Sequence, residues 1–425
     1  MIPAESKGEP LETGQEEKRP CRFCRTPLVH TFVDLGVSPL ANSYLEQADL
    51  GRMEPFYPLH VFVCSRCNLV QLEEVGRPEE IFSDYAYFSS FSESWLEHAR
   101  LFAEAAVERF NLDQGSRVVE IGSNDGYLLR FFKEKGIPVL GIEPALNVAA
   151  AARERGIETM TRFFDRALAR ELASSGMNAD LVVGNNVLAH IPAISDLMQA
   201  LKLVLKPGGV VSMEFPHLQN LIEKNQFDTI YHEHYSYFSL TVAERIFRAH
   251  GLHLYDAGLL ETHGGSLRIL ACREENDACR RTERMKELLD REEEKGLNKL
   301  ETYREFTKQV KRSKYEILEF LIRAKKEKKM LCGYGAPAKG NTLLNYLGAG
   351  TEFIDYTVDR SPHKQGRYLP GSRIPVYEPE RIFETRPDYL VILPWNLKQE
   401  IMDQMAGIRK WGGKFVTLIP EVEVM

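Results

Sequence analysis

The sequence lacks the features that mark membrane, secreted and nucleic-acid-binding proteins. No apolar run approaches the roughly 18 residues of a membrane span. Its 54 lysines and arginines are outnumbered by 61 acidic residues, and no basic stripe appears, whereas phosphate binding needs clustered positive charge. The first 20 residues are polar and lack the apolar core of a signal peptide. We therefore expect a cytoplasmic protein without membrane or nucleic-acid partners.

Cysteine is also scarce, with seven residues in a chain of 425. Cys272, Cys279 and Cys332 are scattered, which suits a reducing compartment better than a disulfide framework. The other four form two Cys-x-x-Cys pairs: Cys21 with Cys24, and Cys64 with Cys67. Two such pairs can complete the tetrahedral, four-thiolate coordination of a structural zinc ion. A redox motif is the alternative, but two pairs without a thioredoxin-like context argue against it.

The length of the chain exceeds one ordinary hydrophobic core and favours two or three domains. We expect an α/β protein with a small N-terminal zinc-binding domain, a central Rossmann-like domain and a C-terminal Rossmann-like α/β domain. The expected boundaries are a disordered lead-in (1–20), the zinc-binding domain (21–80), the central domain (81–272), a helical connector (273–328) and the C-terminal domain (329–425).

The middle of the chain carries a nucleotide-binding pattern. Residues 117–129 read as a buried strand, a glycine turn at Gly122 and Gly126, and a helix. A lone turn of this kind is a weak signal. Here the next strand ends at Glu143, where such folds place the carboxylate that binds ribose hydroxyls. A third strand, 179–184, leads into Asn185 and Asn186, and a helix over 197–205 then stops at a Lys-Pro-Gly-Gly turn before a strand over 210–215.

This combination of E-x-G-x-x-x-G, an acidic strand end and L-K-P-G-G resembles the class I S-adenosylmethionine methyltransferases. The resemblance implies that the central domain (81–272) is a class I methyltransferase Rossmann-like domain. The resemblance implies that S-adenosylmethionine is bound by the turn from Glu120 to Gly126, by the strand-end acid and by the two asparagines. The expected cofactor residues are Glu120, Gly122, Asn124, Asp125, Gly126, Glu143, Asn185 and Asn186.

The densest group of titratable side chains lies in residues 228–239, called the 228–239 segment below. Its sequence D-T-I-Y-H-E-H-Y-S-Y-F-S combines two imidazoles, carboxylates and three phenols, which can hold or move protons near neutral pH. An aromatic loop whose histidines only satisfy backbone groups is the alternative. The segment follows the strand over 210–215 and should therefore reach the carboxyl edge of the sheet, where ligands bind.

A second strand, glycine turn and helix start opens at 329–342 with K-M-L-C-G-Y-G-A-P-A-K-G-N-T. The helix start favours an anion, and Lys339 is placed to meet one. Two nucleotide-type domains suggest two ligands, although a domain that only packs is the alternative.

The ordered set of both cysteine pairs, E-I-G-S-N-D-G, Y-H-E-H-Y-S-Y-F-S, G-Y-G-A-P-A-K-G-N and V-D-R-S-P-x-K-Q-G resembles the C-methyltransferases of nucleotide-linked 4-keto deoxysugars. The resemblance covers nearly the whole chain from Cys21. It implies acid/base roles for Tyr85, His190, Tyr231, Glu233 and His234, and a C-terminal domain that helps to hold a nucleotide diphosphate. We further expect substrate contacts from Tyr87, His263, Lys339, Asn341, Asp359 and Lys364.

Carbon methylation needs an enolate, hence a base on the carbon and a donor to the oxygen. We assign His234 as the base, oriented and kept basic by Glu233, with Tyr231, His190 and Tyr85 stabilising the oxygen. An O-methyltransferase and a non-catalytic sugar sensor are the alternatives. The nucleotide, the sugar, the carbon (C-3 or C-5) and the oligomeric state stay open, with a monomer as one option.

Overall fold

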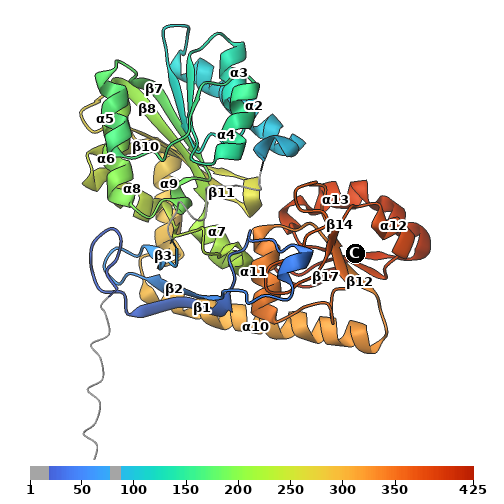
Figure 1. Cartoon of the computed structure of the whole chain (residues 1–425). Coiled ribbons are helices and arrows are strands. Elements are labelled where there is room, and N and C mark those ends of the chain that lie inside the picture. The colour runs from blue at the N-terminus through green and yellow to red at the C-terminus, as the bar shows by residue number, and fades with distance from the viewer. Residues whose placement is uncertain (1–18, 77–87) are drawn as a thin grey trace, which may run out of the picture.

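The computed structural model describes residues 19–76 and 88–425, with the side chain of His263 excepted. Three sheets organise this part of the chain (Figure 1). None of the described helices is long and apolar enough to cross a membrane.

The first sheet belongs mainly to the N-terminal region. Its order is β1 (His30–Ser38), β2 (Tyr57–Val63), β3 (Val70–Leu72) and β9 (Ser236–Tyr237). The first three strands form antiparallel pairs, and β3 pairs antiparallel with β9 through Val70 with Tyr237 and Gln71 with Ser236. The last strand of this sheet therefore comes from the 228–239 segment, far along the chain.

The second sheet has the order β10-β11-β8-β7-β4-β5-β6. Its strands are β4 (Val118–Ile121), β5 (Val139–Ile142), β6 (Thr159–Met160), β7 (Ala179–Asn185), β8 (Leu205–Pro216), β10 (Leu252–Leu260) and β11 (Ser266–Arg273). β4 to β8 pair parallel, and β10 and β11 add an antiparallel end. The chain leaves β4 toward β5 and later returns to its other side with β7, so the carboxyl end of β4 is a topological switch point where ligands bind.

Helices cover both faces of this sheet, as Figure 1 shows. One side carries α2 (Glu93–Phe110), α3 (Leu129–Glu134) and α4 (Leu146–Glu154); the other carries α5 (Arg166–Ser174), α6 (Ile194–Val204) and α8 (Leu240–Ala249). Every residue of β4 is buried. Strands without polar alternation are typical of parallel sheets buried on both faces, and this confirms the expected α/β class.

The connector consists of α9 (Glu283–Glu294) and α10 (Leu300–Lys326). Tyr303, Phe306, Val310 and Ile317 are buried along one stripe of α10, as expected for a helix that packs one face against a core. In Figure 1 this long helix runs beneath β1 and onward to the C-terminal sheet.

The third sheet has the order β14-β13-β12-β15-β16-β17. Its strands are β12 (Leu331–Tyr334), β13 (Tyr356–Val358), β14 (Val376–Tyr377), β15 (Tyr389–Ile392), β16 (Lys414–Thr417) and β17 (Glu423–Val424), and all pair parallel except β17. The helices α11 (Ala338–Leu347), α12 (Arg381–Thr385) and α13 (Lys398–Gln404) accompany it.

The expected elements differ from the observed ones mainly at their ends. α6 begins three residues earlier than expected, and the Lys-Pro-Gly-Gly stretch lies at the start of β8 instead of a free turn. The short helices η4 (Phe227–Thr229) and η5 (Thr262–Gly264) were not expected. The domain boundaries stay a prediction.

Candidate active site

The 228–239 segment lies between the first two sheets and is almost entirely buried. The backbone carbonyl of Tyr235 accepts from Leu72 N at 2.9 Å, and Tyr235 N donates to Ala189 O at 2.8 Å. The carbonyl of Phe238 accepts from Leu218 N at 3.0 Å. These bonds fix the segment beside the residues that follow β7, at the carboxyl edge of the second sheet.

The ring of His234 is held at both nitrogens. Nδ1 lies 3.0 Å from the carbonyl oxygen of Thr229, and Nε2 lies 2.8 Å from the hydroxyl of Tyr231. A carbonyl can only accept, so Nδ1 carries the proton in the neutral ring and Nε2 presents its lone pair. Tyr231 then donates to Nε2. The arrangement supplies a base nitrogen and a phenol donor side by side.

His190 meets this pair from another direction. It ends the short helix η3 (Leu188–His190) after β7, and its ring centroid lies 4.7 Å from that of His234 in an edge-on arrangement. Burial lowers the pKa of His190 to about 4, although a hydrogen bond with the backbone of Glu233 acts in the opposite direction. The ring is therefore neutral at pH 7, and its single N–H is the donor to the backbone of Glu233.

Glu233 does not orient His234 in the way that we expected. Its Oε1 accepts from the side-chain amide of Asn42 at 2.6 Å, while the carbonyl of Thr229 fixes the imidazole. Burial raises the pKa of Glu233 to about 7, and the bond from Asn42 acts against this rise. The carbonyl of Thr229 therefore orients the ring instead. Glu233 precedes His234 in the sequence, but the backbone turns here and the Glu233 side chain points toward Asn42. The other predicted catalytic residue, Tyr85, and the predicted substrate residue Tyr87 lie outside the described residues.

The glycine turn after β4 has the backbone that its sequence predicts. Gly122 and Gly126 have positive φ values of 64° and 77°, which only glycine adopts without cost. A Cβ at Gly122 would lie 2.4 Å from Cγ2 of Val187, so the turn also needs glycine for space. Glu143 accepts from Asn124 N and Ala145 N, both at 2.9 Å.

Several buried acceptor atoms around this turn have no donor in hydrogen-bond geometry among the described residues. They are both carboxyl oxygens of Glu120, Oδ1 of Asp125 and Oδ1 of Asn185. Burial raises the pKa of Glu120 well above its ordinary value, which the nearby Tyr127 hydroxyl partly offsets. Unsatisfied buried acceptors are costly, so a ligand that brings donors fits here. S-adenosylmethionine does so, with an ammonium group and two ribose hydroxyls.

A further carboxylate at the same edge was missed by the sequence analysis. Glu214 of β8 is level with Asn185 of β7, and it is fully buried. Its oxygens accept from His98 Nε2 at 2.8 Å, from Thr262 Oγ1 at 2.7 Å and from Arg268. Burial favours a higher pKa for Glu214, but these partners prevail and lower it to about 2. An acid at the carboxyl end of a buried strand was the available signal; its partners come from distant segments.

Two predicted substrate residues of the C-terminal domain, Asp359 and Lys364, bond to the turn after β12. Asp359 accepts from Ala336 N at 2.7 Å and from Ser361 N at 2.8 Å, and Lys364 Nζ donates to the carbonyl of Ala336 at 2.9 Å. The structure thus brings Asp359 and Lys364 together at one turn. Their roles toward a substrate stay a prediction.

The other predicted substrate residues are held by neighbouring groups. Asn341 is 1% exposed and donates to the carbonyl of Ala41 at 2.6 Å. Lys339 Nζ donates to Asn396 Oδ1 at 2.7 Å. Asn341 therefore joins the C-terminal domain to the N-terminal region. The side chain of His263 lies outside the described part of the structure.

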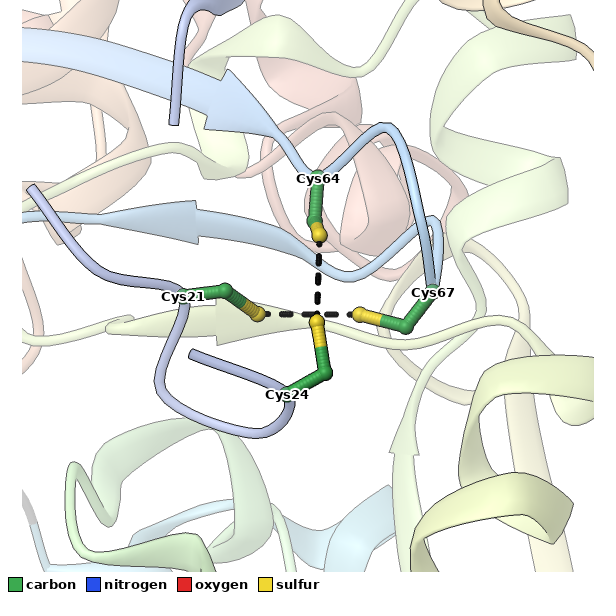
Figure 2. A group of neighbouring side chains, drawn as sticks. All are labelled: Cys21, Cys24, Cys64 and Cys67. Atoms are coloured by element: carbon green, nitrogen blue, oxygen red, sulfur yellow. Dashed lines mark hydrogen bonds between the residues drawn. The ribbon is translucent and has the colours of Figure 1, made fainter. Parts of the chain in front are cut away.

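The four paired cysteines converge on one point, as Figure 2 shows. All four sulfur atoms lie within 4.8 Å of one another, with Cys21 to Cys67 at 3.6 Å and Cys24 to Cys64 at 3.4 Å. Zn–S bonds of about 2.3 Å in a tetrahedron place sulfurs about 3.8 Å apart. The donor set fits zinc, and four thiolates leave no open position for a substrate.

Comparison with known proteins shows similarity to a C-methyltransferase of nearly equal length. C-methyltransferase NovU from Streptomyces niveus is 38% identical over 405 residues, which cover 95% of this chain and 96% of the relative. Three family models match: a zinc binding domain over residues 21–82, a methyltransferase domain over 95–257 and a C-methyltransferase C-terminal domain over 261–420.

Shorter matches also occur. Trans-aconitate 2-methyltransferase from Mycobacterium tuberculosis (strain ATCC 25177 / H37Ra) is 30% identical over 112 residues, 26% of this chain and 41% of that protein. Among solved structures, magnesium protoporphyrin IX methyltransferase from Synechocystis PCC 6803 with bound SAH is 17% identical, with a TM-score of 0.33, covering 42% of this chain and 82% of its own.

Proposed function

Because this chain belongs to the family of S-adenosylmethionine-dependent C-methyltransferases, we propose that it methylates a carbon next to the ketone of a nucleotide-linked 4-keto deoxysugar, at C-3 or C-5. S-adenosylmethionine supplies the methyl group. The remaining task of the protein is to make the sugar carbon nucleophilic, which requires removal of a proton next to the ketone.

The hydrogen-bonded pair of His234 and Tyr231 carries this proposal. Nε2 of His234 holds a lone pair because Nδ1 is committed to the carbonyl of Thr229. In the unliganded protein the Tyr231 hydroxyl occupies that lone pair at 2.8 Å. We propose that the substrate ketone takes over the Tyr231 proton as a hydrogen-bond acceptor. Nε2 is then released to take the proton from the adjacent carbon.

Charge develops on the ketone oxygen as the proton leaves, and two neutral donors are near. Tyr231 is one. The other is the single N–H of the neutral His190 ring, 4.7 Å from the His234 ring, which we propose turns from the Glu233 backbone to the ketone oxygen. Donors that stay neutral do not titrate in the working range, and fixed donors aimed at a developing oxyanion are worth several kcal/mol, about 3 in measured cases. The resulting enolate carbon is the nucleophile.

A deuterium-exchange experiment distinguishes methylation of carbon from methylation of oxygen. Zinc-loaded enzyme is incubated in deuterium oxide with a panel of nucleotide-linked 4-keto-6-deoxysugars and without S-adenosylmethionine. We expect deuterium at the carbon beside the ketone by NMR, and a carbon-bound methyl group once S-adenosylmethionine is added. Methylation of a hydroxyl without prior exchange would show that the enzyme is an O-methyltransferase. No mass gain with any ketosugar would exclude the proposed substrate class.

The role of His234 is tested in the same assay. His234→Asn should lower both exchange and methyl transfer by about 10²- to 10⁴-fold, the usual contribution of a general base. His232→Gln is the matched control, because His232 lies in the same segment but contacts the carbonyl of Pro58 instead of the site. Full methyl transfer by His234→Asn would contradict the assignment of the base.

A further inference from the structure

One loop of the zinc-binding region, residues 41–45, reaches across to the C-terminal domain. The carbonyl of Ala41 accepts from Asn341 at 2.6 Å, and the Tyr44 hydroxyl donates to the carbonyl of Ala336. Leu45 and Tyr368 exchange both backbone bonds, at 3.0 and 2.9 Å. The loop is therefore fixed on both sides of its second residue, Asn42.

Asn42 contacts the predicted active site from this fixed position. Its Nδ2 lies 2.6 Å from Oε1 of Glu233, which is 191 residues away in the sequence. Glu233 is only 2% exposed, and its Oε2 is buried with no hydrogen-bond donor among the described residues. One carboxyl oxygen is thus held by the zinc-binding domain, and the other is available to a ligand.

We propose that Asn42 is a positioning residue of the active site, which holds the Glu233 carboxyl so that Oε2 can accept a hydroxyl group of the bound sugar. The substrate class in this proposal rests on the function proposed above. The zinc-binding domain then does more than stabilise the fold, because it supplies a polar side chain that acts on the substrate through Glu233.

Two further observations support a role that depends on geometry. Burial raises the pKa of Glu233 to about 7, and the bond from Asn42 is the interaction that opposes this rise. The same domain also holds the backbone of the segment, since β3 pairs with β9 and Arg22 donates to the carbonyl of Tyr235 at 2.9 Å. The domain therefore holds the backbone of the 228–239 segment, and Asn42 in addition holds the side chain of Glu233.

The first test follows the Glu233 carboxyl itself and needs no substrate. Infrared spectra of the zinc-loaded protein are recorded across pH, and the Glu233→Gln spectrum is subtracted to isolate one carboxyl band. Asn42→Ala should shift the titration of that band upward by about one pH unit, because a hydrogen bond to the charged form is lost. Ser43→Ala, an exposed neighbour in the same loop, should leave the titration unchanged.

The second test asks whether Asn42 acts through Glu233. We expect Asn42→Ala to lower kcat/KM for the ketosugar about 10-fold, and Asn42→Gln, which keeps the amide, to restore part of the loss. In a Glu233→Ala background the Asn42→Ala change should cause no further loss, since coupled residues are not additive. Zinc content and Tm identify any variant that has merely lost its fold.

An unshifted carboxyl titration in Asn42→Ala, or losses that simply add in the double variant, would overturn the proposal. The outcome is separate from that of the proposed function. If the wild-type enzyme proved inactive on every ketosugar, the carboxyl titration would still decide whether Asn42 holds Glu233.

Discussion

The glycine turn after β4 and the glycine turn after β12 share one design in sequence: a buried strand, a glycine with positive φ and a helix. Their side chains differ. At the first turn, Glu120, Asp125 and Asn185 keep buried acceptor atoms without a donor among the described residues.

At the second turn, Asp359 and Lys364 are bonded to the turn itself, and Asn341 donates to the N-terminal region. Oδ1 of Asn341 and Oγ of Ser361 stay without a hydrogen-bond partner in the part of the chain that the structure describes. The first turn is built to receive a ligand that brings donors, whereas most polar groups of the second turn are already bonded to other groups of the protein. The same backbone pattern therefore serves two purposes, and the partners of the side chains tell them apart.

The largest expected effect concerns pH and the buried carboxyls near the ligand sites. Burial raises the pKa of Glu233 from 4.5 to about 7, so the folded protein binds a proton there that the unfolded chain releases. This contribution is complete below about pH 4.5 and is lost as pH rises to about 7. The difference in unfolding free energy between wild type and Glu233→Gln should change by about 3 kcal/mol across this window.

Denaturant unfolding of the unliganded, zinc-loaded protein at several pH values measures this difference. Subtracting the variant removes the contribution of His190, whose lowered pKa acts with the opposite sign. Parallel pH profiles for wild type and Glu233→Gln would show that Glu233 titrates normally in the folded protein.

The second prediction tests whether the first turn receives the ligand. Glu120→Gln keeps the shape of the side chain but prevents it from becoming the carboxylate that a ligand ammonium group would stabilise on binding. We expect the Kd of S-adenosylmethionine to rise about 100-fold, because buried hydrogen bonds to charged groups are worth about 1.5–3 kcal/mol. Isothermal titration calorimetry measures the Kd, and Tm should not fall, since burial already favours the neutral carboxyl. Unchanged affinity would remove Glu120 from the cofactor site.

The sequence could predict those features of the sites that depend on residues close together in the chain, and not those that depend on distant residues. Local patterns were sufficient for the cysteine pairs, for the turn at Gly122 and for the strand ending at Glu143, because each depends on neighbours in sequence. The partners of Glu233 and Glu214 were not predictable, since Asn42 and Arg268 lie 191 and 54 residues away. For the same reason β9 was not expected to join the sheet of the zinc-binding domain.

The third prediction tests whether the polar groups of the second turn stabilise the fold without affecting cofactor binding. Asp359→Ala leaves Ala336 N and Ser361 N without their acceptor, which should cost about 2 kcal/mol of unfolding free energy. The Kd of S-adenosylmethionine should change less than about twofold, as the first turn is untouched. Asp277→Ala, at an exposed position, is the control in both measurements. An Asp359→Ala protein that keeps its stability but binds S-adenosylmethionine more weakly would show that the second turn serves ligand binding and not the fold.

The smallest effect is expected at Lys339, the residue of the second turn that still has donors to offer. Its ammonium group has three donors; one meets Asn396, and the group lies 4.6 Å from the centre of the Trp395 ring. Burial lowers the pKa of Lys339, while Asp228 acts in the opposite direction and favours the charged form. An amine with donors left at a helix start suits a phosphate group.

Lys339→Met should therefore raise the KM for the proposed nucleotide-sugar substrate about 10-fold, the lower end of what a charged hydrogen bond contributes, while the Kd of S-adenosylmethionine stays unchanged. Lys398→Met, an exposed lysine of the same domain, should leave the KM unchanged. Initial-rate kinetics at saturating S-adenosylmethionine provide the KM. An unchanged KM in Lys339→Met would mean that the polar groups of the second turn only stabilise the fold and do not hold the substrate. The first turn would then be the one turn of the two that binds a ligand.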